Sequence, residues 1–223
     1  MASTRSGQEV TLYGAAGQPF RGYVCGPQNA PRGVLLIHEW WGLKDHNRAL
    51  AEQFAELGYR ALVADLYDGR VTDDAQQAGE WMRSLDQGEV DGKLRAALRY
   101  LQAPGRRVAT YGCSFGGRQA LEASLLDLHA VAATVMLYSR METDARRLRA
   151  LNGPVLAIYA EGERAWPEKM HAFERAMAEA GKVTESHSYA ADHGFTNPTS
   201  PRYDREADQA AWSVTLAFLA RYL

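Results

Sequence analysis

Short apolar runs alternate with longer amphipathic segments along almost the whole chain. The run Gly33-Val34-Leu35-Leu36-Ile37 is continuously apolar, as expected of a strand that is buried on both faces. The segment 45–57 instead carries apolar residues at helical spacing, and the next residue is Gly58, a typical helix stop. Because strands that alternate with helices are joined by right-handed crossovers, the pattern predicts a mostly parallel sheet with helices on both faces.

The same alternation continues to the end of the chain. Strands are expected at 9–13, 20–25, 33–37, 60–64, 107–111, 130–138, 154–160 and 183–189. Helices are expected at 45–57, 72–85, 90–101, 115–126, 144–151, 167–180 and 203–223. The first two strands flank Gly14-Ala15-Ala16-Gly17, which predicts an N-terminal antiparallel hairpin. Because no repeat of fixed period and no low-complexity linker occurs, residues 1–223 are expected to form a single domain, with about 1–8 flexible.

The composition excludes several classes of protein. An apolar fraction of 46% and a charged fraction of 23% are ordinary for a globular chain, which argues against a disordered or fibrous one. The formal net charge of −2 argues against a protein that wraps a nucleic-acid duplex. Cys25 and Cys113 are too few for a disulfide scaffold or a zinc site, and we expect buried free thiols in a reducing compartment.

Nothing in the sequence indicates export or a membrane span. Residues 1–10 lack the apolar stretch of a signal peptide. The longest apolar run, at 130–138, is interrupted by Thr134 and is too short to cross a bilayer. We therefore expect a soluble, cytoplasmic protein whose partner is neither a nucleic acid nor a membrane, and its oligomeric state is left open.

The most informative stretch joins an apolar strand to a helix through Gly112-Cys113-Ser114-Phe115-Gly116. Gly-x-Ser-x-Gly in this setting predicts a nucleophile elbow, a strained turn that lifts the serine above the edge of the sheet. The residues two before and two after the nucleophile must be small, and Gly112 and Gly116 meet this requirement for Ser114. The neighbours of Cys113 at the same spacing are bulky, so Ser114 is expected to be the nucleophile and Cys113 a buried neighbour.

A nucleophilic serine needs a base to take its proton. In α/β-hydrolases the order along the chain is serine, acid, histidine. His193 follows the last expected strand in a loop with Gly194, from which its ring could reach Ser114. The other histidines precede the expected acid loop or lie inside expected elements: His38, His46, His129, His171 and His187.

The acid that orients the base should follow the expected strand 154–160. The loop after this strand contains Glu161 and Glu163 but no aspartate. We expect Glu163 to be the acid, with Glu161 as the rival. Asp192 is adjacent to His193 in sequence and is poorly positioned to meet its Nδ1 atom.

The expected strand 33–37 runs into a second loop, His38-Glu39-Trp40-Trp41-Gly42. The backbone N–H groups of Trp40 and Phe115 are the expected oxyanion hole, and the helix that begins at Phe115 points its positive end at the site. Trp41 is expected to line the pocket. A His-Glu-x-x-His zinc motif would need histidine where Gly42 stands, so no metal is expected.

With these loops assigned, the chain resembles the dienelactone hydrolase family of the α/β-hydrolase superfamily, as a member with Ser114 in place of the family's cysteine nucleophile. The matching segments occur in the family's order over nearly the whole chain: His38-Glu39-Trp40-Trp41-Gly42, Asp65-Leu66-Tyr67, Gly112-Cys113-Ser114-Phe115-Gly116-Gly117 and His193-Gly194-Phe195. The resemblance implies an α/β-hydrolase fold without a large lid, and hydrolysis of an ester or lactone without a cofactor.

The resemblance also implies roles for individual residues. It carries the nucleophile to Ser114, the base to His193, the acid to Glu163 and a carboxylate in the pocket to Glu39. Tyr138 is a further candidate for substrate binding. Family members that hydrolyse dienelactones hold the substrate carboxylate with arginines, and residues 72–80 contain none. We therefore expect another small carboxylic ester or lactone, cleaved through an acyl-enzyme by an enzyme of class EC 3.1.1.

Two alternatives keep the same fold. One is a different acyl hydrolase, such as a thioesterase or a peptidase, that uses the same residues. The other is a catalytically silent α/β-hydrolase-fold protein that binds a ligand or a partner. A nucleotide-dependent oxidoreductase is disfavoured, because no glycine-rich turn follows the expected strand 33–37.

Overall fold

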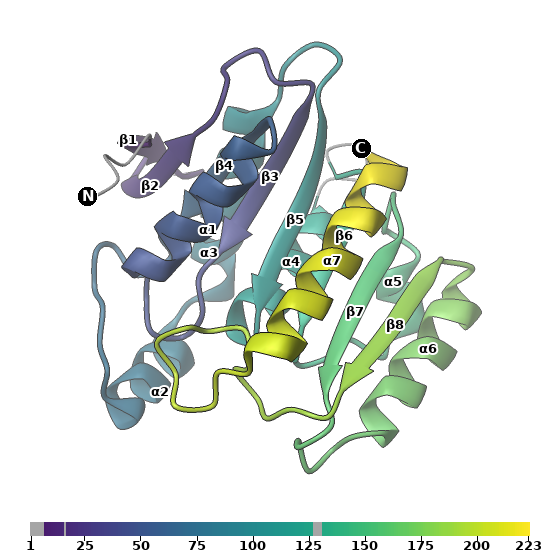
Figure 1. The fold of residues 1–223 in the computed structure, drawn as a ribbon. Helices are drawn as coiled ribbons and strands as arrows, with labels where there is room; N and C mark the ends of the chain where they lie inside the picture. The colour runs from purple at the N-terminus through teal and green to yellow at the C-terminus, as the bar shows by residue number, and fades with distance from the viewer. Residues whose placement is uncertain (1–6, 16, 127–130) are drawn as a thin grey trace. The chain divides into compact units, whose positions relative to one another are not determined.

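The computed structural model describes residues 7–15, 17–126 and 131–223, and it contains eight strands and seven helices in these ranges (Figure 1). The chain divides into two compact units, which we call the N-terminal unit (Met1–Val108) and the C-terminal unit (Ala109–Leu223). Most of the segment expected to be flexible, residues 1–6, lies outside the described residues, and β1 begins at Gln8. The expectation of a single domain stays a prediction.

The N-terminal unit contains a four-stranded arrangement in the order β1-β2-β4-β3. The hairpin predicted from the glycine-flanked turn is present, with β1 (Gln8–Tyr13) antiparallel to β2 (Pro19–Cys25). Strand β2 is also antiparallel to β4 (Tyr59–Ala64), and β4 is parallel to β3 (Arg32–Ile37). Parallel pairing therefore begins at β3, the run whose continuous apolar character predicted a strand buried on both faces.

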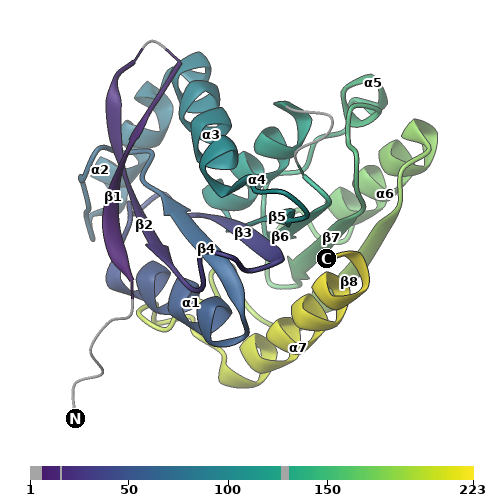
Figure 2. The same ribbon diagram turned by 90° about the horizontal axis from the view of Figure 1, so that it is seen from above.

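Three helices cover these strands. They are α1 (Asp45–Glu56), α2 (Ala75–Ser84) and α3 (Gln87–Leu101). Figure 2 shows α1 and α3 on opposite faces of the N-terminal strands, as a sheet buried on both faces requires. Helix α1 ends before Gly58, whose φ of 82° lies in the left-handed region that favours glycine at a helix stop.

Four parallel strands in the order β5-β6-β7-β8 belong to the C-terminal unit, except for the first two residues of β5. These strands are β5 (Arg107–Cys113), β6 (Ala133–Leu137), β7 (Val155–Ala160) and β8 (Thr184–Tyr189). The helices are α4 (Phe115–Leu126), α5 (Ala145–Leu148), α6 (Glu168–Ala180) and α7 (Arg205–Tyr222). Parallel strands direct their carboxyl ends to one edge, which Figure 1 shows for β5, β7 and β8.

Each expected strand and helix is present, and the ends differ mainly at caps. Helix α7 begins at Arg205, two residues later than expected, because the Asp204 carboxylate accepts hydrogen bonds from the backbone N–H groups of Glu206 and Ala207. The strand expected at 130–138 spans only Ala133–Leu137, and residue 130 lies outside the described residues. Helix α5 is the only helix described between β6 and β7.

The two thiols differ in burial. Cys25 is buried, as expected. Cys113 was expected to be buried as well, but it is half-buried, because it ends β5 next to a turn at the edge of the sheet. Its Sγ atom lies 3.8 Å from the Tyr111 hydroxyl and 3.7 Å from Thr196 Oγ1.

Candidate active site

Ser114 occupies a sharp turn between the end of β5 and the start of α4. Its φ of 54° lies in the left-handed region, which is costly for a residue that carries a Cβ atom. The backbone N–H of Ser114 donates a hydrogen bond to the carbonyl of Leu137, with N and O 2.9 Å apart. The strained turn predicted from Gly-x-Ser-x-Gly is therefore present in the structure.

Steric crowding explains the first glycine of this motif. A Cβ atom added to Gly112 would lie 2.2 Å from the backbone of Gly116, far inside van der Waals contact. Gly117 is crowded as well, because a Cβ atom there would lie 1.8 Å from Ser139 Oγ. The Gly116 backbone at the first position, and the Ser139 side chain and Gly112 carbonyl at the second, thus leave no space for a Cβ atom.

Three loops at the carboxyl ends of parallel strands bring Ser114, Glu163 and His193 together. His193 Nε2 lies 2.8 Å from Ser114 Oγ. On the other side of the ring, His193 Nδ1 lies 2.6 Å from Glu163 Oε1. A carboxylate can only accept hydrogen bonds, so Nδ1 carries the proton of the neutral ring and Nε2 is left to accept the serine proton.

The two glutamates of the acid loop have different partners. Glu163 contacts the imidazole, whereas Glu161 accepts a hydrogen bond from the Ser188 hydroxyl, with the two oxygens 2.7 Å apart. Asp192 is exposed. Of the two glutamates that the sequence left open, Glu163 is therefore the one whose carboxylate meets His193.

Lys169, in the first turn of α6, is a member of this site that sequence reasoning missed. Its Nζ donates a hydrogen bond to Glu163 Oε2. Burial alone would raise the pKa of Glu163, but hydrogen bonds from His193 and Lys169 and the charge of Lys169 outweigh it and lower this pKa below its ordinary value. No local motif marks a lysine six residues after the acid, so only the folded structure reveals the contact.

Tyr138 packs directly against the imidazole. The two ring centroids are 5.0 Å apart in an edge-to-face arrangement, and only 1% of the tyrosine surface is exposed. The Tyr138 hydroxyl lies 2.6 Å from Thr196 Oγ1, in the loop that carries His193. The residue named from the sequence for substrate binding thus contacts the imidazole and the loop on which it sits.

The loop after β3 belongs to the N-terminal unit and is organised by a buried histidine. His38 is fully buried, with Nδ1 2.6 Å from the Glu39 carbonyl oxygen and Nε2 accepting a hydrogen bond from the Leu66 N–H at 3.0 Å. These partners require the neutral ring with its proton on Nδ1. Burial lowers the pKa of His38, although the Asp65 carboxylate opposes this shift.

The residues that follow His38 are the remaining sequence candidates. Glu39 is buried, and its Oε2 lies 3.6 Å from His46 Nε2. Trp40 and Trp41 are half-buried and pack edge to face, with ring centroids 5.0 Å apart. Phe115, the other expected oxyanion donor, is the first residue of α4 in the C-terminal unit.

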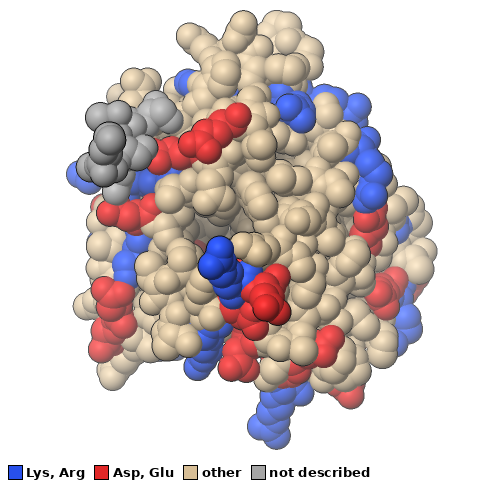
Figure 3. Space-filling model, viewed as in Figure 1, with Lys and Arg blue, Asp and Glu red and all other residues tan. Residues whose placement is uncertain are grey.

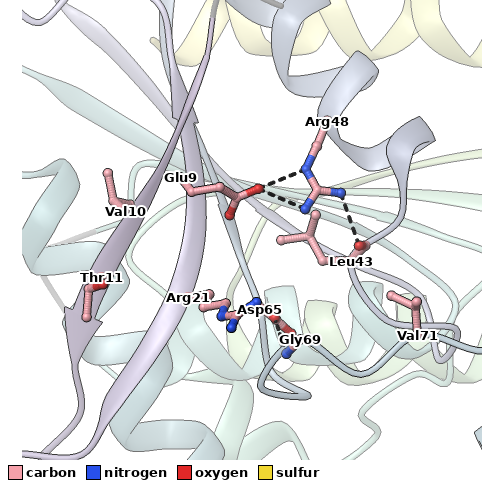
Figure 4. A pocket seen from close by; sticks show the side chains of 9 residues that line it. All are labelled: Glu9, Val10, Thr11, Arg21, Leu43, Arg48, Asp65, Gly69 and Val71. Carbon is pink, nitrogen blue, oxygen red and sulfur yellow. Dashed lines mark hydrogen bonds and ion pairs between the residues drawn. The ribbon is translucent and has the colours of Figure 1, made fainter.

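The N-terminal unit also contains a cavity of about 440 Å³ (Figure 4). It lies between the hairpin, the start of α1 and the loop after β4, and Arg48 crosses it to reach Glu9, with Nη2 and Oε1 2.8 Å apart. None of the catalytic, oxyanion-hole or substrate-binding candidates predicted from the sequence lines this cavity, although Asp65 of the matching segment Asp65-Leu66-Tyr67 does. Its lining comprises Glu9, Val10, Thr11, Arg21, Leu43, Arg48, Asp65, Gly69 and Val71.

Other features of the described residues bear on partners. No three His, Cys, Asp or Glu side chains in residues 7–15, 17–126 and 131–223 are grouped as a metal site. No helix in the same ranges combines the length and the apolar character that a bilayer crossing needs. Acidic and basic side chains are intermixed on the face in Figure 3, in line with the net charge of −2.

The strand-turn-helix elbow and the Ser114–His193–Glu163 contacts have the geometry that a nucleophile, its base and an orienting acid require. A sequence model described as the dienelactone hydrolase family matches residues 20–223. The chain belongs to the dienelactone hydrolase family. Membership of the dienelactone hydrolase family supports hydrolase activity on small esters or lactones, as the resemblance implied.

The chain is also similar to individual proteins in sequence and in structure. Protein usf of Aquifex pyrophilus is 26% identical over 93% of this chain and 95% of its own length. The carboxymethylenebutenolidase homolog of Homo sapiens is 25% identical, over 73% of this chain and 67% of that protein. The solved structure named m3DLH is 25% identical and superposes with a TM-score of 0.86 over 98% of this chain and 99% of that one. The expected α/β-hydrolase fold is thereby confirmed.

Proposed function

We propose that the protein is a serine hydrolase that cleaves a small carboxylic ester or lactone through an acyl-enzyme. The observation that carries the proposal is the continuous contact from Ser114 Oγ through the His193 ring to the Glu163 carboxylate, with separations of 2.8 and 2.6 Å. Both separations are within the reach required of a nucleophile, its base and the group that orients the base.

The reaction follows the usual order of acyl transfer. Ser114 Oγ attacks the carbonyl carbon while its proton passes to His193 Nε2. His193 then gives this proton to the departing alkoxide, which leaves an acyl group on the serine. A water molecule next loses a proton to His193 and attacks the acyl group, and the proton returns to Ser114 as the acid is released. Glu163 remains ionised throughout and stabilises the imidazolium.

The remaining candidates receive roles in the same reaction. We assign the oxyanion hole to the backbone N–H groups of Phe115 and Trp40, since the start of α4 favours developing negative charge. Glu39 and Trp41 are assigned to substrate binding. We assign Tyr138 to supporting His193 rather than to substrate binding, because its ring is buried against the imidazole.

The test uses p-nitrophenyl acetate and the Ser114→Ala variant. We expect kcat/KM to fall by on the order of 10⁴-fold or more, because the acyl-enzyme cannot form. A Cys113→Ala variant is the control for the neighbouring side chain and should keep most of the activity. Hydrolysis by Ser114→Ala at the wild-type rate would overturn the mechanism.

A fluorophosphonate probe tests the silent-binder alternative. An activated Ser114 should be labelled, and the label should be lost in Ser114→Ala. A wild-type protein that stays unlabelled, and that does not hydrolyse the ester, would instead support a ligand-binding role for the fold. A panel of thioesters and peptide substrates then separates the other acyl hydrolases from an esterase.

A further inference from the structure

Lys169 holds the second oxygen of the Glu163 carboxylate. One oxygen, Oε1, receives His193 Nδ1 at 2.6 Å, and the other, Oε2, receives the Lys169 ammonium. The same ammonium lies 3.4 Å from the carbonyl oxygen of Ser139, in the turn after β6. The carboxylate is therefore held between two donors, and it has a defined orientation toward the imidazole.

The lysine is itself fixed by its surroundings. Its side chain is 18% exposed, and that of Glu163 is 15% exposed. The Lys169 ammonium lies 6.0 Å from the ring centroid of the fully buried Tyr159. Its backbone N–H donates to the Ala165 carbonyl at 2.9 Å, which ties the first turn of α6 to the acid loop. An ion pair in such a setting is screened less by water than one at the surface.

The other ionisable groups nearby are engaged elsewhere or face solvent. On the acid loop, Arg164 is exposed and Glu161 is hydrogen-bonded to Ser188. Glu168 in the first turn of α6 and Asp192 in the base loop are exposed. Among the described residues, Lys169 is thus the cationic side chain that contacts the Glu163 carboxylate.

We propose that Lys169 is a positioning residue of the triad, whose ammonium holds the Glu163 carboxylate toward His193 and offsets part of its negative charge. This inference rests on the proposed function. A bare carboxylate beside an imidazole favours the imidazolium form. Removing the ammonium would leave the charge of Glu163 unopposed beside His193, so we expect activity to be lost at a higher pH in variants that lack it.

The test compares pH profiles of kcat/KM for p-nitrophenyl acetate in Lys169→Met, Lys169→Gln and Lys169→Arg. Each profile falls on its low-pH side, which we call the acid limb. Without the ammonium, the acid limb of kcat/KM should move to higher pH by about one unit in the Met and Gln variants. At a fixed pH on the acid side of the profile, kcat/KM of the Met and Gln variants should therefore be about tenfold lower than that of the wild type. Lys169→Arg keeps the charge and should keep the wild-type limb.

Lys182→Met is the matched control, because Lys182 also donates to a backbone carbonyl, that of Leu151 at 2.6 Å, but lies outside the triad. A merely structural role for Lys169 would lower the active fraction, counted by fluorophosphonate labelling, at every pH and leave the limb unmoved. Where Lys169→Met does not fold, Lys169→Gln and Lys169→Arg carry the comparison.

The outcomes separate this inference from the proposed function. An acid limb in Lys169→Gln that coincides with that of the wild type overturns the role of Lys169, whatever the maximal rate. If Ser114→Ala is inactive in the same experiment, the serine mechanism stands without the lysine. If Ser114→Ala is fully active, the proposed function itself fails.

Discussion

At the scale of single residues, Glu163 shows how partners from different segments determine the state of one side chain. Burial opposes ionisation of this carboxyl, yet the contacts with His193 and Lys169 lower its pKa below the ordinary value. Glu161, two residues away, contacts Ser188 instead. Glu163, the acid predicted from the sequence, and its rival Glu161 thus have different environments, and Glu163 is the one whose carboxylate contacts the imidazole.

Replacing Glu163 by glutamine tests this difference. The amide keeps the size of the side chain but can no longer stabilise the imidazolium, so we expect kcat/KM for p-nitrophenyl acetate to fall on the order of 10³-fold. Glu161→Gln is the matched control and should remain within about twofold of wild type. Equal losses in both variants would contradict the assignment of the acid.

At the scale of elements, the junction of β5 and α4 depends on how closely two backbones approach. Ser114 adopts a left-handed φ of 54°, and the backbone of Gly116 lies where a side chain on Gly112 would begin. The sequence motif predicted this turn, because the steric requirements of the turn involve only a few neighbouring residues. The start of α7 was less accurately predicted, since it depends on the Asp204 carboxylate accepting the backbone N–H groups of Glu206 and Ala207.

Gly112→Ala should therefore destabilise the protein. The added Cβ would meet the Gly116 backbone at 2.2 Å, and backbone cannot move aside as a flexible side chain can. We expect the free energy of unfolding in urea to fall by at least about 2 kcal/mol.

The control for this prediction is Gly14→Ala, where the nearest atom would be 3.7 Å away, an ordinary contact. Its free energy of unfolding should change by less than about 1 kcal/mol. A Gly112→Ala protein as stable as Gly14→Ala would show that the turn can relax.

At the scale of the whole molecule, buried titratable groups link stability to pH. His38 is neutral in the folded state, because burial lowers its pKa and its Nε2 accepts a backbone hydrogen bond. In the unfolded chain this imidazole regains its ordinary pKa of about 6.5 and binds a proton below it. Acid therefore favours the unfolded state, and stability is lost as pH falls below this value.

His38→Gln should weaken that dependence. The glutamine side chain can still accept a hydrogen bond but cannot titrate, so its free energy of unfolding should fall less than that of wild type between pH 7 and pH 5. The exposed His171 on α6 supplies the control, and His171→Gln should follow the wild-type slope. Identical slopes in all three proteins would show that His38 contributes nothing to the pH dependence.

The sequence by itself determined the order and type of the strands and helices, the antiparallel hairpin and the turn at Ser114. Each of these depends on residues close together in the chain, and such patterns can be read from spacing and from the positions of glycine. The resemblance to the dienelactone hydrolase family also rested on short segments of this kind, and the family model matches residues 20–223.

Only the tertiary structure decided which partners meet across loops. The contact of Glu163 rather than Glu161 with His193 and the packing of Tyr138 on the imidazole join segments that are distant in sequence. The contact of Lys169 with the Glu163 carboxylate joins the acid loop to the first turn of α6. These contacts depend on how β5, β6, β7 and β8 align their carboxyl ends. They also depend on side-chain rotamers, which can move a polar atom by a few ångströms. No spacing rule along the chain encodes such distances, because they arise from packing between elements rather than within them.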